Sequence, residues 1–243
     1  MIQDILRDVI KYVHGVGVFP AVKVDQTQNG ITLSSTNAEK TVVLTATSKL
    51  TFDNTDATFG LGQLDLLQRL LDCPEYEENV SIGLGVEGGK LDRIEFANAA
   101  GDFTNNYRLM SRALIETLVP PTKFVGAKWA VDFAPPLTSV QRFNLQASTN
   151  PGETSFVIKT VKNNLEVSFG TPATHSGRFV FANNITGKTV GDLPFSVPVF
   201  QKVLNLSSHA QSASLKMADR GLMCMTLDSG LVEYNYYIIG LSK

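Results

Sequence analysis

The residues that could carry out chemistry lie far apart in this sequence. The three histidines, His14, His175 and His209, show no spacing typical of a metal site. Cys73 and Cys224 stand alone without a CxxC pattern, so we expect buried, reduced thiols rather than metal ligands or a disulfide. No P-loop, GxSxG or HExxH motif occurs in the 243 residues. The sequence therefore predicts no metal, no cofactor and no catalytic residue.

Two weaker patterns have ordinary structural explanations. The segment 83–88, Gly-Leu-Gly-Val-Glu-Gly, imitates a dinucleotide-binding loop. It leads into strand-like sequence instead of a helix, which favours a β-turn. The acidic pairs Asp53/Asp56 and Asp92/Glu95 could serve as acid and base, but solvated surface is the usual place of such carboxylates. An enzyme is therefore an alternative that no particular motif favours.

Composition and charge limit the class of protein. A hydrophobic fraction of 43% with 18% charged residues predicts a folded globular chain. The net charge of −2 argues against tight binding of nucleic acid by a strongly basic surface, although a local basic patch could make loose contact. Charged residues interrupt the N-terminal segment, and no run of about 18 uncharged apolar residues occurs. We therefore expect an intracellular, cytoplasmic protein with no signal peptide and no contact with a membrane.

Four segments have apolar residues at the spacing of an amphipathic helix. They begin near residues 2, 61, 138 and 198. Between them, alternating and β-branched residues predict strands, with hairpin turns at Asn29-Gly30, Gly88-Gly89 and Asp228-Ser229-Gly230. From Leu193 to Leu241 the pattern is strand, helix and β-meander, which includes a turn at Asp219-Arg220-Gly221. The sequence therefore predicts an α+β fold with antiparallel sheets.

The helix spacing indicates a duplication. The two expected helix starts lie 59 residues apart in the first half and 60 in the second, and corresponding starts lie 136 and 137 residues apart. We therefore predict two similar domains, 1–118 and 129–243, joined by an interdomain connector at 119–128. The connector belongs to a stretch without clear periodicity that begins at Arg112 and carries Pro120-Pro121. An unrelated α+β protein with accidental spacing is the alternative.

With this layout, the chain resembles the DNA sliding clamps, most of all those of T-even-type phages. The resemblance covers nearly the whole chain and rests on order and spacing, with three local matches. These are GLGQLDLLQRLLDC at 60–73, WAVDFAPPLTSVQRFNLQAS at 129–148 and the closing DRGLMCMTLDSGLVEYNYYIIGL, which is similar to the ending of eukaryotic and archaeal clamps. One feature departs from the family. Clamps usually have a strand before the first helix, and here that helix begins almost at Met1.

The resemblance implies a two-domain clamp subunit, with two helices packed on antiparallel sheets in each domain, that closes head to tail into a homotrimeric ring. Such a ring encircles duplex DNA, tethers the replicative DNA polymerase and is placed on DNA by an ATP-dependent clamp loader. Cations on the helices would face the DNA: Arg7, Lys11, Arg69, Arg142 and Lys202. Each of them alone fits an ordinary solvated helix face equally well. A β-rich phage structural or assembly protein is the alternative, and tight assembly independent of DNA would favour it.

The resemblance also implies two protein interfaces. Ring closure would pair an edge strand at Thr104–Leu114 with another at Gly177–Thr186, and the residues packed across it would be Tyr107, Leu109, Phe179 and Phe181. A partner peptide would dock in an apolar pocket between the connector and the C-terminal strand. The residues expected to line it are Leu118, Val119, Pro120, Pro121, Phe124, Tyr236, Tyr237, Ile238 and Ile239. Strand geometry turns about half of the last four toward the core.

Overall fold

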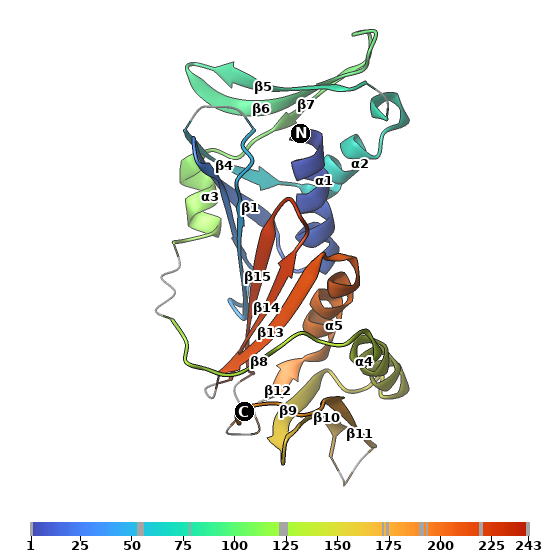
Figure 1. The fold of residues 1–243 in the computed structure, drawn as a ribbon. Coiled ribbons are helices and arrows are strands. Elements are labelled where there is room, and N and C mark those ends of the chain that lie inside the picture. The colour runs from blue at the N-terminus through green and yellow to red at the C-terminus, as the bar shows by residue number, and fades with distance from the viewer. Residues whose placement is uncertain are drawn as a thin grey trace. The chain divides into compact units, whose positions relative to one another are not determined.

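The computed structural model describes most of the chain as two compact units. The described residues are 2–52, 56–77, 79–121, 126–171, 173, 175–189, 192, 194–218 and 221–241. The first unit consists of residues 1–38 and 44–123, and the second of residues 39–43 and 124–243. Each unit contains antiparallel strands and its own pair of packed helices (Figure 1).

The first unit begins with helix α1 (Ile2–Tyr12) and the short 3-10 helix η1 (His14–Val16). Four strands follow, β1 (Ala21–Thr27), β2 (Gly30–Thr36), β3 (Val42–Ser48) and β4 (Ala57–Gly62), and they pair in the order β4-β1-β2-β3. Helix α2 (Leu64–Leu71) and η2 (Pro74–Tyr76) lead to a second sheet of β5 (Ser81–Glu87), β6 (Lys90–Ala97) and β7 (Thr104–Arg108). Helix α3 (Arg112–Leu118) ends the regular part of the unit.

The second unit begins with strand β8 (Trp129–Phe133) and helix α4 (Leu137–Thr149). Strands β9 (Ser155–Val161), β10 (Asn164–Gly170), β11 (Ser176–Ala182) and β12 (Pro194–Ser196) pair in the order β12-β9-β10-β11. Helix α5 (Val197–Leu206) and η3 (Ser207–His209) follow. The chain ends with β13 (Ser212–Ala218), β14 (Leu222–Asp228) and β15 (Glu233–Ile239), and β8 pairs with β13.

The two units repeat one topology. The order β4-β1-β2-β3 corresponds to β12-β9-β10-β11, and β5-β6-β7 corresponds to β13-β14-β15. Helix α1 packs on α2 as α4 packs on α5, and the helix starts are 62 and 60 residues apart within the two units. The predicted α+β fold and its duplication are confirmed. Strand β8 lacks a counterpart in the first unit, because it precedes α4 whereas no strand among the described residues precedes α1. Helix α3 lacks one in the second unit, since no helix among the described residues follows β15.

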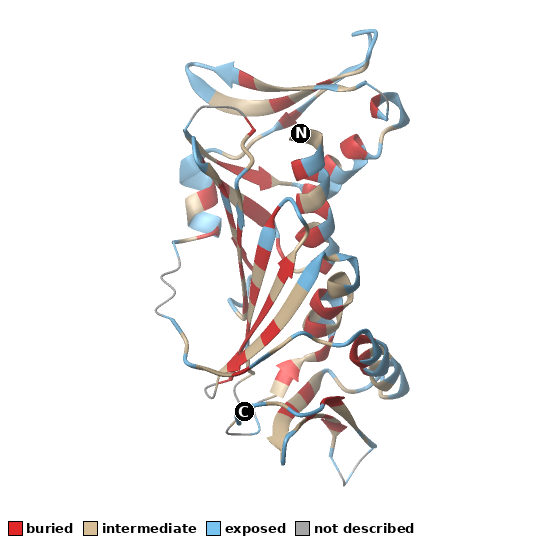
Figure 2. Cartoon of the chain, in the orientation of Figure 1, coloured by how far each residue is buried: buried red, intermediate tan, exposed pale blue. Residues whose placement is uncertain are grey.

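Apolar side chains of the helices and of alternate strand residues form the core. Figure 2 shows buried positions alternating with more exposed ones along β15, as expected of a strand covered on one face. In the second unit, Phe143 of α4 packs against α5, β9 and β10. Its ring centre lies 5.0 Å from those of Phe156 and Phe200 and 5.4 Å from that of Phe169. All four rings are fully buried. Aromatic contacts of this kind stabilise a core beyond the area they bury.

The predicted hairpin turns are confirmed where the structure describes them. Gln28 and Asn29 connect β1 to β2, with Thr27 opposite Gly30. Gly88 and Gly89 connect β5 to β6, and both have positive φ, which glycine adopts without strain. The turn after Asp228 joins β14 to β15. The turn predicted at Asp219-Arg220 lies outside the described residues.

Helix α3 was not predicted, because the stretch from Arg112 shows no clear apolar period. The side-chain oxygen of Ser111 accepts a hydrogen bond from the first turn of α3, at 3.4 Å from the nitrogen of Leu114. Ile115 is fully buried and packs with Ala21. It fits only because residue 60 is glycine: a Cβ there would lie 2.7 Å from Cγ1 of Ile115. The position of α3 therefore depends on a contact with a distant strand.

Both predicted edge strands are shorter than expected. Strand β7 ends at Arg108 rather than at Leu114, because Met110 leaves the sheet to pair with Gly60 in an isolated bridge and α3 then begins. Strand β11 ends at Ala182 rather than at Thr186. Each of the two strands still lies at the end of its sheet order, so the expectation that they are edge strands is met.

Candidate nucleic-acid interface

Helices α4 and α5 carry two exposed cations and no carboxylate. Their buried sides include Phe143 on α4 and Phe200 on α5, and Arg142 and Lys202 lie on the exposed sides. Neither cation forms an ion pair with any residue that the structure describes. The charge of this helix pair is therefore available to attract an anion from solution.

Amide side chains join these two helices. The Nδ2 group of Asn144 on α4 donates a hydrogen bond to Oδ1 of Asn205 on α5, at 2.7 Å. Nε2 of Gln201 on α5 donates to Oδ1 of Asn144, at 2.9 Å. These bonds hold the helices together without adding negative charge beside Arg142 and Lys202. Asn and Gln side chains also contact phosphate groups directly or through water.

Helices α1 and α2 expose three cations in different surroundings. Arg7, Lys11 and Arg69 are exposed, but the same helices carry Asp4, Asp8 and Asp65, so their formal charge sums to zero. Nη2 of Arg7 donates to the carbonyl of Leu71 at 2.6 Å, and its Nη1 lies 4.0 Å from Oδ1 of Asp72. Nζ of Lys11 lies 5.3 Å from the centre of the Tyr12 ring. All five predicted cations are thus exposed on helices, but only those of α4 and α5 lack carboxylates on their own helices.

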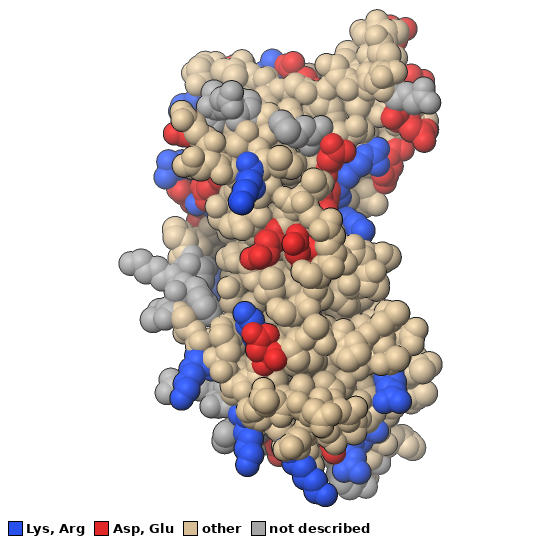
Figure 3. Space-filling model, viewed as in Figure 1, with Lys and Arg blue, Asp and Glu red and all other residues tan. Residues whose placement is uncertain are grey.

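The charge of the whole chain divides in the same way. The first unit has 10 Lys and Arg against 15 Asp and Glu, a formal charge of −5. The second unit has 11 against 8, a charge of +3, and the two values add to the net −2 of the chain. On the face drawn in Figure 3, Lys and Arg side chains gather over the end of the second unit that contains β9–β11. A polyanion is therefore attracted more strongly by the second unit.

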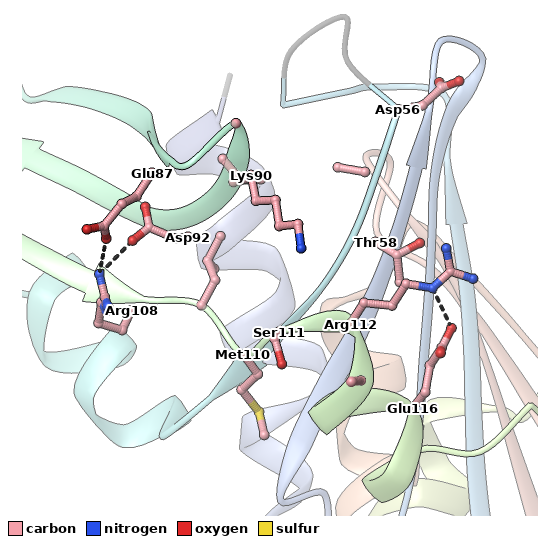
Figure 4. Close-up of a pocket in the computed structure, with 15 residues that line it drawn as sticks. Asp56, Thr58, Glu87, Lys90, Asp92, Arg108, Met110, Ser111, Arg112 and Glu116 are labelled. Atoms are coloured by element: carbon pink, nitrogen blue, oxygen red, sulfur yellow. Dashed lines mark hydrogen bonds and ion pairs between the residues drawn. The ribbon is translucent and has the colours of Figure 1, made fainter.

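A pocket of about 920 Å³ in the first unit is the alternative place for a ligand (Figure 4). The ends of β5, β6 and β7, strand β4 and the start of α3 enclose it. Arg108 is paired with Asp92 at 2.5 Å and with Glu87 at 3.5 Å, and Arg112 with Glu116 at 3.0 Å. The lining includes four carboxylates and three cations, so it holds no excess of positive charge. The pocket therefore does not suit a phosphate group.

The catalytic and metal-site alternatives gain no support from the described residues. Asp92 and Glu95 both bind Arg93, at 2.9 and 2.7 Å. The hydrogen bond to Glu95 is the main cause of the raised pKa of Arg93. Asp53 lies outside the described part of the chain. Within that part, no three His, Cys, Asp or Glu side chains gather as metal ligands do, and no helix is long and apolar enough to cross a membrane.

The cysteines and the glycine-rich segment have structural roles. Both cysteines are free: Cys224 is buried, as predicted, whereas Cys73 is only partly buried. Burial is the main cause of the raised pKa of Cys224, which keeps its thiol protonated at neutral pH. Residues 83–88 form most of β5 and the start of its turn, and no helix follows them. They therefore lack the strand-to-helix geometry that binds a dinucleotide.

The residues predicted at the subunit interface separate into two groups. Tyr107 and Phe181 are each only 1% exposed and belong to the cores of their own units. The hydroxyl of Tyr107 donates to the carbonyl of Gly62, and burial raises the pKa of this tyrosine. Leu109 and Phe179 are half-buried. Because side chains alternate between the two faces of a strand, a contact at these edges would use main-chain groups and the outward side chains instead.

The C-terminal strand residues of the predicted peptide pocket separate by strand alternation. Tyr236 and Ile238 are 0% and 1% exposed, whereas Ile239 is 43% exposed and Tyr237 is half-buried. Leu118 and Pro121 are exposed, Pro120 is half-buried and Val119 is buried. Phe124 lies outside the described residues. The side chains accessible to a partner therefore include Leu118, Pro121 and Ile239.

Solved structures of proliferating cell nuclear antigen (PCNA) share this fold over nearly the whole chain. A structure of A. fulgidus PCNA with the C-terminal region of FEN-1 bound matches with a TM-score of 0.72 at 10% identity, covering 99% of this chain and 96% of that one. PCNA of Thermococcus kodakaraensis has a TM-score of 0.72 at 12% identity, covering 97% of each chain. PCNA of Entamoeba histolytica has a TM-score of 0.67 at 11% identity, covering 100% and 95%.

No protein-family model and no curated protein sequence matches the chain. At 10–12% identity, the similarity to the solved structures concerns the fold. The architecture of this chain, two units of antiparallel strands with a pair of helices in each, is that of PCNA. The chain therefore has the DNA clamp fold.

Proposed function

We propose that this chain is a subunit of a sliding clamp that encircles duplex DNA and tethers a replicative DNA polymerase. The observation that carries the proposal is the PCNA-like fold, which extends over 99% of this chain and 96% of A. fulgidus PCNA. The exposed cations of the helices, above all Arg142 and Lys202, support it. In this proposal the protein is a scaffold with no catalytic residues.

The sparse positive charge suits a protein that slides on DNA. Affinity for a duplex rises with each phosphate that Lys or Arg neutralises, and many such contacts would hold the protein at one place. Helices α4 and α5 offer only Arg142 and Lys202 as cations, with Asn and Gln between them. Topology would then keep the ring on DNA while these weak contacts let it move.

Assembly is proposed as a head-to-tail homotrimer. The edge strand β7 of one subunit would pair with β11 of the next, because both lie at the ends of their sheets. The opposite formal charges of the two units, −5 and +3, would favour this arrangement over contact between like units. An ATP-dependent loader would open the ring and place it on DNA.

Partner binding is proposed at exposed apolar side chains. A. fulgidus PCNA binds the C-terminal region of FEN-1, and we infer that this chain likewise takes short peptides of polymerase and loader. Leu118, Pro121 and Ile239 are the exposed members of the predicted peptide pocket. Titration calorimetry with such a peptide and an Ile239→Ser variant is the measurement that checks this assignment.

The subunit count tests the proposed assembly. Light scattering coupled to gel filtration is expected to give three times 26.4 kDa, about 79 kDa, and negative-stain images are expected to show a ring. High salt should shift the mass toward that of the subunit if the charges of the two units assist assembly. A monomer at micromolar concentration, with no ring after crosslinking, would count against the clamp. Large assemblies without a ring would favour the structural-protein alternative.

A further inference from the structure

Comparison of the two units reveals a sheet edge, that of β5, without a partner strand among the described residues, although the corresponding edge of the second unit has one. In the second unit, β8 completes the sheet by pairing with β13 in antiparallel register, with Val131 opposite Met217 and Phe133 opposite Leu215. The corresponding sheet of the first unit stops at β5. No strand among the described residues pairs with the free edge of β5. Figure 1 shows β5 as the outermost strand of its sheet.

Apolar side chains of β5 are more exposed than those at corresponding places in β13. Leu215 and Met217 of β13 are 0% and 3% exposed. Their counterparts in β5 are Leu84 and Val86, since Leu84 faces Ile94 of β6 as Leu215 faces Met225 of β14. Leu84 is half-buried and Val86 is 60% exposed. The first unit therefore exposes apolar surface at the place where the second unit buries it.

The edge of β5 has few of the features that usually prevent strand addition. Exposed edge strands in proteins are protected by Lys, Pro, inward charges, β-bulges or covering loops. Of these, β5 shows a register shift against β6, between Gly85 and Val86 near its end. The sequence of β5, SIGLGVE, contains no Lys and no Pro, and its one charge is the terminal Glu87. The opposite edge strand β7, TNNYR, is polar by comparison. No described strand pairs with the main-chain N–H and C=O groups on the outer side of β5, so another strand can bind there.

We propose that β5 binds an extended segment of a partner polypeptide as an added antiparallel strand, in the way that β8 lies on β13. Strand addition of this kind gains affinity from main-chain hydrogen bonds and specificity from alternate side chains. The model provided by β8 has large apolar residues at alternate positions, Trp129, Val131 and Phe133. The partner segment should accordingly alternate apolar with other residues over about five positions.

Charge distinguishes the two ends of this edge. Glu75 and Glu77 are exposed just before β5, whereas Glu87 at its end lies 3.5 Å from Arg108 and opposite Lys90. The first unit as a whole has a formal charge of −5. A segment with Lys or Arg at the end beside Glu75 and Glu77 would therefore be favoured over an acidic one, by attraction that salt weakens. This surface differs from the proposed β7 edge and from the DNA-facing helices, so its test is independent of the proposed function.

Hydrogen exchange of the full chain tests the proposal directly. The probe is a synthetic peptide with the β8 sequence WAVDF and two lysines at each end, and the control peptide has the same composition in scrambled order. Without the probe, alternate amides of β5 should exchange much faster than those of β13, because only one side of β5 is paired. Saturating probe should slow exchange of those outer β5 amides by at least about tenfold, and the scrambled peptide should not.

A matched pair of variants decides whether the contact involves β5. Val86→Lys should weaken binding of the probe at least about tenfold, since it places a cation among apolar contacts and repels the lysines of the probe. Leu137→Lys adds the same charge on α4 at a residue that is also 60% exposed, and should leave binding unchanged.

Three outcomes would overturn the proposal. The first is equal binding of the probe by both variants. The second is probe-induced protection at β7 or β13 without protection at β5, and the third is no protection of β5 at millimolar probe. Concentration-dependent protection of β5 without any probe would show instead that a second copy of the chain fills the edge.

Discussion

Reversal of Arg142 and Lys202 to Glu is expected to lower the affinity for duplex DNA by at least about tenfold at low salt. Both side chains are exposed on α4 and α5 and form no ion pair with any described residue. Their replacement should therefore leave the ion pairs among the described residues intact. The dependence of log affinity on log salt should also become shallower, by about 0.9 for each phosphate that is no longer neutralised. Fluorescence anisotropy of a labelled duplex over a salt series measures both quantities.

A control variant separates contact at the helices from the general effect of charge. Reversal of Lys162 and Lys188 to Glu makes the same change in net charge at a loop surface of the second unit, where both lysines line a small pocket of about 420 Å³. This control should lower the affinity much less, because distant charges are screened. An equal fall in affinity in the two double variants would contradict the assignment of α4 and α5 as the DNA-facing helices.

Replacement of Phe143 by Ala is expected to lower the free energy of unfolding of the second unit by about 3–5 kcal/mol. The ring is fully buried and contacts Phe156, Phe169 and Phe200. Its removal therefore leaves a cavity where α4 packs on α5, β9 and β10. Urea unfolding monitored by the single tryptophan, Trp129 of β8 in the same unit, measures the decrease.

Leu145→Ala is the matched control for this prediction. Leu145 lies on the same helix as Phe143, and its side chain is 65% exposed. Its removal should cost about 1 kcal/mol or less, because little apolar area leaves the core. A similar decrease in both variants would show that Phe143 does not organise the core of the second unit.

The main elements could be predicted from the sequence because their signals are local. The apolar residues of α1 recur every three or four positions. The Gly88-Gly89 turn lies directly between the two strands that it joins, β5 and β6. The duplication followed from the spacing of these elements. Helix α3 could not be found in this way, because its position depends on a residue far away in the sequence. Gly60 of β4 leaves room for the side chain of Ile115.

The candidate site could be predicted only in part for a similar reason. Helix periodicity placed Arg7 and Arg142 correctly on exposed sides. It could not indicate that Arg7 donates to the carbonyl of Leu71 while Arg142 forms no ion pair with a described residue, because those surroundings depend on how helices pack. Strand alternation likewise gives two sets of side chains without saying which set is covered, and Tyr107 and Phe181 belong to the covered one.

Retention on circular DNA is the most direct test of the claim that the protein encircles a duplex. The protein is incubated at high concentration with a nicked circular plasmid, excess protein is removed by gel filtration at about 200 mM salt, and a restriction enzyme then cuts the circle once. A ring held by topology should stay on the intact circle and leave rapidly through the ends of the linear product. Equal rates of release from circular and linear DNA would contradict the account, because they would show that affinity rather than topology holds the protein.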